Sequence, residues 1–222
     1  MRAIKVSGAE PHAEILLPDY VARTAKHFGV PPRQVRSEGM FDDFGIRLRF
    51  DKPTQYQLYD ADLKLAQQPR ALLAKYGAVI FENAYLADAY RTIGQRNIFP
   101  NMGFHLDRVA GFGNRISLFL RDPFDEDQCH PRKSSTLIAP YEVIRLQSIK
   151  EGQAFNAGQA RVDLFGNERI RPLLDQLLLH QAWTAPEGTG EMCLIDNRCV
   201  YHASYYRVHK QRGYPIGVRY LY

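Results

Sequence analysis

Two histidines and an aspartate, set far apart in the chain, most constrain how this sequence can fold. His105 and Asp107 flank a single leucine in an extended segment. In a strand, side chains two positions apart point to the same face, so these two side chains converge. His202 ends a second extended segment, 199–202, which follows the apolar run 192–195. A fold that joins all three side chains has to bring strands from the middle and the end of the chain face to face.

These three residues have the chemistry of a metal centre with positions left open. Two imidazoles and one carboxylate on one face of a divalent ion form the facial triad of non-haem Fe(II) oxygenases. A His-x-Asp pair alone is weak evidence, because a chain of this composition is expected to contain roughly 0.4 such pairs by chance. Each histidine taken singly is more often a structural residue. The joint pattern of His105, Asp107 and His202 favours the metal centre.

The order and spacing of the motifs resemble the Fe(II)/2-oxoglutarate-dependent dioxygenases of the taurine dioxygenase and clavaminate synthase-like family. The family pattern is His-x-Asp, a long middle section, a segment like DNR…H, and an arginine about ten to thirteen residues later. Here these motifs are FHLD, LIDNRCVYH and KQR. The segment LAQQPRALLAKYGAVIFENAYL is also similar to the helix and strand that open the family fold, so the resemblance runs from about residue 60 to the C-terminus.

The resemblance implies an iron site and a binding site for the cosubstrate 2-oxoglutarate. The implied Fe(II) ligands are His105, Asp107 and His202. Arg212 is implied to pair with the distal carboxylate of 2-oxoglutarate, and Thr136 to share that carboxylate. Arg219 is a second candidate, because relatives commonly carry another arginine after the first, although at closer spacing than here. Which arginine does which job stays open at this point.

The predicted fold is mainly β with flanking helices, arranged as a distorted double-stranded β-helix, or jelly roll. We expect one domain over residues 1–222, with an N-terminal extension over 1–57 and the jelly-roll core with its helices over 58–222. Apolar spacing and turn residues predict helices and strands outside the metal motifs. The expected helices cover residues 19–29, 60–76, 83–93 and 171–181, and the expected strands cover 78–81, 115–120 and 216–222.

Composition supports an ordinary globular protein with no special partner. The net charge is +5, and the basic residues are spread along the chain, so we expect neither nucleic-acid nor membrane binding. The 3 cysteines form no CxxC pair, which favours free thiols in a reducing compartment and a cytoplasmic location. Motifs typical of serine hydrolases, P-loop kinases and dinucleotide-binding dehydrogenases are missing from the sequence. A monomer and a homo-oligomer are both compatible with these data.

The function implied by the resemblance is hydroxylation of a C–H bond of a small polar metabolite, amino-acid-like or anionic. The reaction would use Fe(II), O2 and 2-oxoglutarate, which is decarboxylated to succinate. Two alternatives stay open. One is a hydroxylase of the same scaffold that acts on a peptide, an RNA or a lipid-linked sugar, and the other is a jelly-roll binding protein without redox chemistry.

Overall fold

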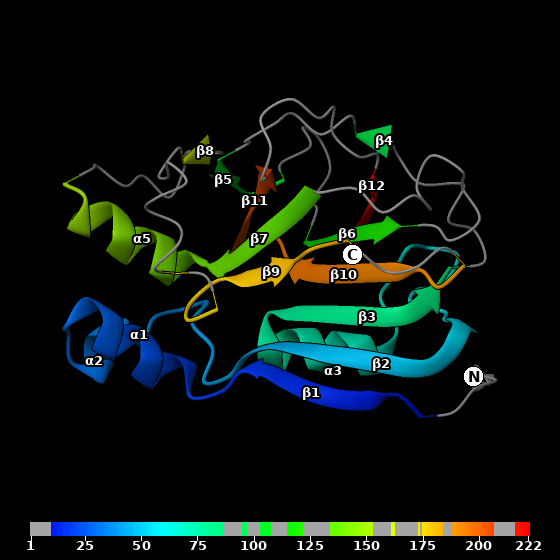
Figure 1. The fold of residues 1–222 in the computed structure, drawn as a ribbon, viewed down its shortest axis with the longest axis horizontal. Coiled ribbons are helices and arrows are strands. Elements are labelled where there is room, and N and C mark those ends of the chain that lie inside the picture. The colour runs from blue at the N-terminus through cyan, green and yellow to red at the C-terminus, as the bar shows by residue number, and fades with distance from the viewer. Residues whose placement is uncertain are drawn as a thin grey trace.

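The computed structural model shows two β-sheets with helices against them (Figure 1). It describes residues 10–86, 95–96, 103–107, 115–121, 134–152, 161–162, 173, 175–183, 188–206 and 216–222. Among the helices in these ranges, none is long and apolar enough to span a membrane.

The larger sheet has seven strands and the smaller sheet has five. In spatial order the larger sheet contains β1 (His12–Leu17), β2 (Phe44–Gln55), β3 (Ala78–Tyr85), β10 (Glu191–Asp196), β6 (Ile116–Arg121), β12 (Ile216–Leu221) and β4 (Gln95–Arg96). The smaller sheet contains β8 (Arg161–Val162), β5 (Phe104–His105), β11 (Val200–Tyr206), β7 (Ser134–Pro140) and β9 (Leu179–Gln181).

The strand pairing is that of a jelly roll. Strands β4 to β7 form one arm of an antiparallel ribbon and β9 to β12 form the other, because β4 pairs with β12, β5 with β11, β6 with β10, and β7 with β9. The ribbon is also folded over into a barrel-like structure, so that β6 pairs with β12 and β7 pairs with β11. The expected double-stranded β-helix is therefore confirmed by the topology of the chain itself.

The N-terminal segment enlarges one sheet of this core. β1 pairs antiparallel with β2, and β2 pairs parallel with β3. A parallel pair needs a crossover connection, and here the crossover contains helix α3 (Gln67–Tyr76). Much of the segment expected to be an extension thus continues the larger sheet.

Three further helices complete the described part of the chain. They are α1 (Tyr20–Phe28), α2 (Pro32–Val35) and α5 (Tyr141–Lys150). The helix expected over 19–29 is confirmed as α1, and Gly29 ends it in the left-handed conformation. Asp19 does not cap α1 through its side chain, and α5 was not predicted.

Two predictions of helical structure are wrong in the residues that the structure describes. Asn83 was expected to start a helix over 83–93, but it lies inside β3, where its side chain donates to the carbonyl oxygen of Phe50 at 2.7 Å; residues 87–93 of that prediction lie outside the described ranges. The late helix over 171–181 is replaced by a turn at 175–177 and by β9. Asp175 has a φ of 63°, which is incompatible with a continuous right-handed helix. The backbone groups of β9 form their hydrogen bonds with β7 instead of within a helix.

The two faces of the larger sheet belong to different hydrophobic clusters. One face, with Phe119 and Val218, belongs to a cluster that also contains residues of the smaller sheet. The other face, with Leu118, packs with Tyr59 and with Leu73 of α3. We call these the inner and outer faces of the larger sheet. Alternation along β6 and β12 therefore decides which side chains can reach the space between the sheets.

Candidate metal centre

The two predicted histidine ligands lie directly opposite each other in the smaller sheet. His105 on β5 and His202 on β11 are register partners in an antiparallel pair, so their side chains share one face. Their ring centroids are 4.1 Å apart with the planes inclined by 52°. The ring of Phe119, on the inner face of the larger sheet, lies 4.9 Å from that of His202. The histidine face of the smaller sheet is therefore the one that looks toward the larger sheet.

Asp107 completes the group from the residues just after β5. One carboxylate oxygen, Oδ1, is 3.7 Å from His105 Nε2, and the other, Oδ2, is 3.6 Å from His202 Nε2. All three residues are buried, with exposed fractions of 8% for His105, 3% for Asp107 and 4% for His202. The structure thus brings together the three side chains that the sequence singled out.

The dimensions of this triad suit a metal ion. One ligand atom from each residue can be chosen so that all lie within 4.8 Å of one another. Bonds of roughly 2.0–2.2 Å from one ion to imidazole and carboxylate ligands place two ligand atoms roughly 3–4 Å apart. The two histidine–aspartate distances already fall in that range, so a small contraction of the group is enough for a common ion. The donor set, two neutral imidazoles and one carboxylate, is the one that the facial triad requires.

The backbone fixes which nitrogen of His105 faces the centre. Nδ1 lies 2.8 Å from the carbonyl oxygen of Gly103, which can only accept a hydrogen bond. Nδ1 therefore carries the proton in the neutral ring, and the lone pair is on Nε2, the atom beside Asp107. Such contacts hold the tautomer and the ring orientation of metal-binding histidines.

Asp107 is held at its side chain and at its backbone. The hydroxyl of Ser117 donates to Oδ2 at 3.2 Å. Asn197 Oδ1 accepts from the backbone N–H of Asp107 at 2.7 Å, and Asn197 Nδ2 donates to the backbone carbonyl of Asp107. Sequence reasoning did not identify Asn197 or Ser117 as partners of Asp107. A periodicity signal was available for Ser117, because it shares a strand face with Phe119.

Thr136 lies on the same face of the smaller sheet as the histidines. It is two positions from Ile138, which pairs with His202 across β7 and β11. It is buried, and its hydroxyl accepts a hydrogen bond from the indole nitrogen of Trp183 at 2.8 Å. Trp183 was not predicted as part of the site.

Arg219 lies on the other side of the larger sheet from the triad. It pairs with Leu118 in register, whereas its neighbour Val218 pairs with Phe119, so Arg219 faces outward. Its guanidinium donates to the hydroxyl of Tyr59 and lies 5.1 Å from that ring. The structure does not bring Arg219 to the triad. Arg212 lies outside the described residues.

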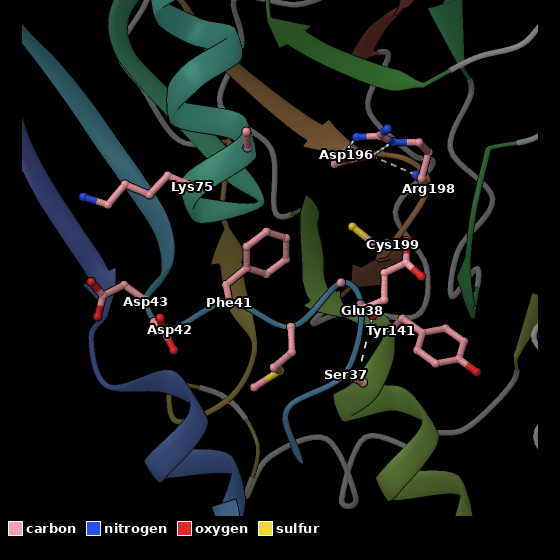
Figure 2. Close-up of a pocket in the computed structure, with 13 residues that line it drawn as sticks. Ser37, Glu38, Phe41, Asp42, Asp43, Lys75, Tyr141, Asp196, Arg198 and Cys199 are labelled. Carbon is pink, nitrogen blue, oxygen red and sulfur yellow. Dashed lines mark hydrogen bonds and ion pairs between the residues drawn. The ribbon is translucent and has the colours of Figure 1, made fainter. Parts of the chain in front are cut away.

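A cavity of about 930 Å³ lies beside the turn that joins β10 to β11, and none of the triad residues lines it. Figure 2 shows Asp196, Arg198 and Cys199 of that turn on one side and Lys75 and Asp43 on the other. Burial raises the pKa of the Cys199 thiol to about 12, so it is protonated near neutral pH.

The comparisons with known proteins return structural similarity only. No family model and no curated protein sequence matches the chain. Similar solved structures include PvcB, an Fe, alpha-ketoglutarate dependent oxygenase from an isonitrile synthetic pathway, at 11% identity, covering 80% of this chain and 85% of that one, with a TM-score of 0.43. A taurine dioxygenase from Burkholderia xenovorans is 13% identical, with coverages of 82% and 88% and a TM-score of 0.42. AAD-2 in complex with Mn(II) and N-oxalylglycine is 13% identical, with coverages of 83% and 96% and a TM-score of 0.44.

These solved structures include oxygenases of the class that the sequence resemblance indicates. Their TM-scores all lie below 0.5. The assignment of a function therefore depends on the triad of this chain and on the jelly roll that positions it.

Proposed function

We propose that this protein is an Fe(II)- and 2-oxoglutarate-dependent oxygenase that hydroxylates a C–H bond of a small polar metabolite. The observation that carries the proposal is the buried group of His105, Asp107 and His202, whose ligand atoms gather within 4.8 Å between the two sheets. A triad of this kind occupies one face of an iron ion and leaves positions for a cosubstrate and dioxygen. When bound, the iron supplies the activation of dioxygen, coupled to decarboxylation of 2-oxoglutarate to succinate.

The chain's own residues orient and enclose this centre. His105 presents Nε2 because Gly103 holds the proton on Nδ1, and Ser117 holds one oxygen of Asp107. Phe119 packs against His202 and keeps water from that side of the ring. Because the triad is buried, charges placed there interact more strongly than they do in water.

Thr136 is proposed to bind the distal carboxylate of 2-oxoglutarate. The indole N–H of Trp183 can only donate, so the threonine oxygen is the acceptor in their hydrogen bond. This arrangement leaves the hydroxyl hydrogen of Thr136 to donate to a carboxylate on the triad side. Arg212 is proposed as the charged partner of the same carboxylate, since Arg219 faces the outer side of its sheet.

A small metabolite is proposed as the substrate because the triad is enclosed. With exposed fractions of 8% or less, the three ligands offer little surface to a large, rigid partner. Small-molecule sites are typically concave and bury most of the ligand surface.

Anaerobic titration of Fe(II)-loaded protein with 2-oxoglutarate tests the proposal. The chelate gives a weak visible charge-transfer band, which we expect in the wild-type protein and not in His105→Ala or Asp107→Ala. Succinate release is then measured across a panel of amino acids and other polar metabolites.

Different failures of this test have different meanings. A protein that takes up Zn(II) but gives neither the band nor oxygen consumption is a binding protein without redox chemistry. Succinate release that appears only with a peptide, an RNA or a lipid-linked sugar would assign the chain to the macromolecule-directed hydroxylases.

A further inference from the structure

We propose that Asn197 is the positioning residue for the carboxylate ligand Asp107, and that its amide sets the geometry of the metal centre. The inference depends on the proposed metal centre and goes beyond it, because Asn197 does not contact the ligand atoms. It acts through the backbone of Asp107.

The side-chain amide of Asn197 forms with Asp107 the two backbone hydrogen bonds that a neighbouring strand would otherwise form. β5 ends at His105, and this is the residue of β5 that pairs in register with β11. Asp107 therefore lies beyond the paired part of the strand. Asn197 Oδ1 accepts from the N–H of Asp107 at 2.7 Å, and Asn197 Nδ2 donates to the carbonyl oxygen of the same residue. Both backbone groups of a residue that is 3% exposed are thereby satisfied. The side chain of Asn197 therefore extends the pairing of β5 by a further residue.

Asn197 is itself fixed in the turn between β10 and β11. Its backbone N–H donates to the carbonyl oxygen of Arg115 at 2.9 Å, and the N–H of Cys199 donates to that of Asp196 at 3.1 Å. Asn197 is 5% exposed. A rotation of the amide away from Asp107 would leave buried polar groups unsatisfied, which holds the side chain in one orientation.

The same turn leads into the strand that carries the third ligand. β11 begins three residues after Asn197 and holds His202. The hydrogen bonds of Asn197 therefore connect Asp107 to the segment of His202 at a second point, besides the pair of His105 with His202. Asn197 fixes the carboxylate relative to both imidazoles.

The outer side of the turn supplies a matched control. Arg198 donates from Nε and Nη2 to the two carboxylate oxygens of Asp196 at 2.9 and 2.6 Å. Figure 2 shows this pair at the cavity, which none of the triad residues lines. Replacing Arg198 loosens the turn without removing a contact to Asp107.

The test is a titration of the purified full-length apo-protein with Co(II) alone, followed by its visible d–d spectrum. We compare the wild type with Asn197→Ala, Asn197→Asp and Arg198→Ala. Loss of an outer partner of a metal ligand typically costs 10–100-fold in metal affinity. We expect about that loss for Asn197→Ala and less than about threefold for Arg198→Ala. The spectrum of Asn197→Ala should also change in intensity, because a displaced carboxylate alters the coordination of the ion.

Asn197→Asp separates positioning from electrostatics and also serves if Asn197→Ala does not fold. The added negative charge alone would tighten the binding of a cation. It also replaces the donor to the carbonyl of Asp107 with a second acceptor, so positioning predicts weaker binding. Tighter or unchanged Co(II) binding in Asn197→Asp would overturn the inference.

The remaining outcomes are equally decisive. If the wild type binds no Co(II), the proposed metal centre fails and this inference fails with it. If the wild type binds and Asn197→Ala binds within about twofold of it, the metal centre stands and the role of Asn197 is refuted. Equal losses in Asn197→Ala and Arg198→Ala would mean that the folding of the turn matters and the amide does not.

Discussion

Metal binding should stabilise the fold measurably, because the three ligands come from two distant parts of the chain. His105 ends β5, Asp107 lies two residues after it, and His202 lies on β11. The unfolded chain cannot gather these atoms within 4.8 Å, so the ion binds the native state far more tightly than the unfolded state. Added metal is therefore expected to raise the free energy of unfolding.

The size of the effect follows from mass action. At 100 times its Kd, Co(II) adds about 2.7 kcal/mol to the free energy of unfolding, and each further tenfold adds about 1.4 kcal/mol. For a chain of this length, 2.7 kcal/mol corresponds to a rise in Tm of about 5–10 °C. This rise in Tm is measured by following thermal unfolding with circular dichroism at several Co(II) concentrations.

A histidine outside the site gives the control. His12 is exposed on β1 and pairs with Asp51 at 3.1 Å. His12→Ala should keep the full rise in Tm, whereas His105→Ala should lose it. An equal rise in wild type and His105→Ala would show that the ion binds elsewhere and would refute the triad.

Four more substitutions test other parts of the site and core. Thr136→Val keeps the shape and removes the hydroxyl, so 2-oxoglutarate affinity should fall about tenfold, with unchanged Co(II) affinity, when the chelate band is titrated. In the same titration, Arg212→Ala should strongly lower the affinity for 2-oxoglutarate, whereas Arg219→Ala should hardly change it. If Arg219→Ala causes the larger loss, the assignment of the two arginines is reversed. Burial raises the pKa of the Cys193 thiol from 9.0 to about 12, so its neutral form stabilises the fold below pH 9 and this contribution is lost as the pH rises toward 12. Raising the pH from 8 to 10 should lower the free energy of unfolding of the wild type by about 1 kcal/mol more than that of Cys193→Ala, as measured by urea unfolding. An equal decrease in both proteins would contradict the assigned effect of burial.

The proposed metal ligands could be predicted from sequence because their chemistry and their order along the chain agree. His105 lies on β5 as the extended pattern predicts, whereas Asp107 lies two residues further on, past the end of that strand. The apolar run at 192–195 predicts β10 correctly, and the apolar spacing at 115–120 and 216–222 predicts β6 and β12. In each case a local apolar pattern matches a strand with buried side chains.

The errors arise where the partner strand decides the structure. The leucines near 173–178 fit a helical spacing, yet the backbone from Leu179 onward pairs with β7. Asn83 has the side chain of a helix cap, but the neighbouring strand offers the carbonyl of Phe50 instead. The face of Arg219 depends on its register against Leu118, which no local pattern reveals. Register and long-range pairing are tertiary properties, so a single sequence specifies them poorly.

The wrapped ribbon also dictates when the centre can be assembled during synthesis. His105 lies on the first arm with Asp107 just after its strand, and His202 lies on the second arm, which leaves the ribosome later. A nascent chain therefore holds at most two of the three ligands until the β11 segment has emerged, and long-range pairings of this kind form slowly. Loading of the proposed metal centre therefore has to follow synthesis of the β11 segment, and a chain truncated before His202 lacks the third proposed ligand.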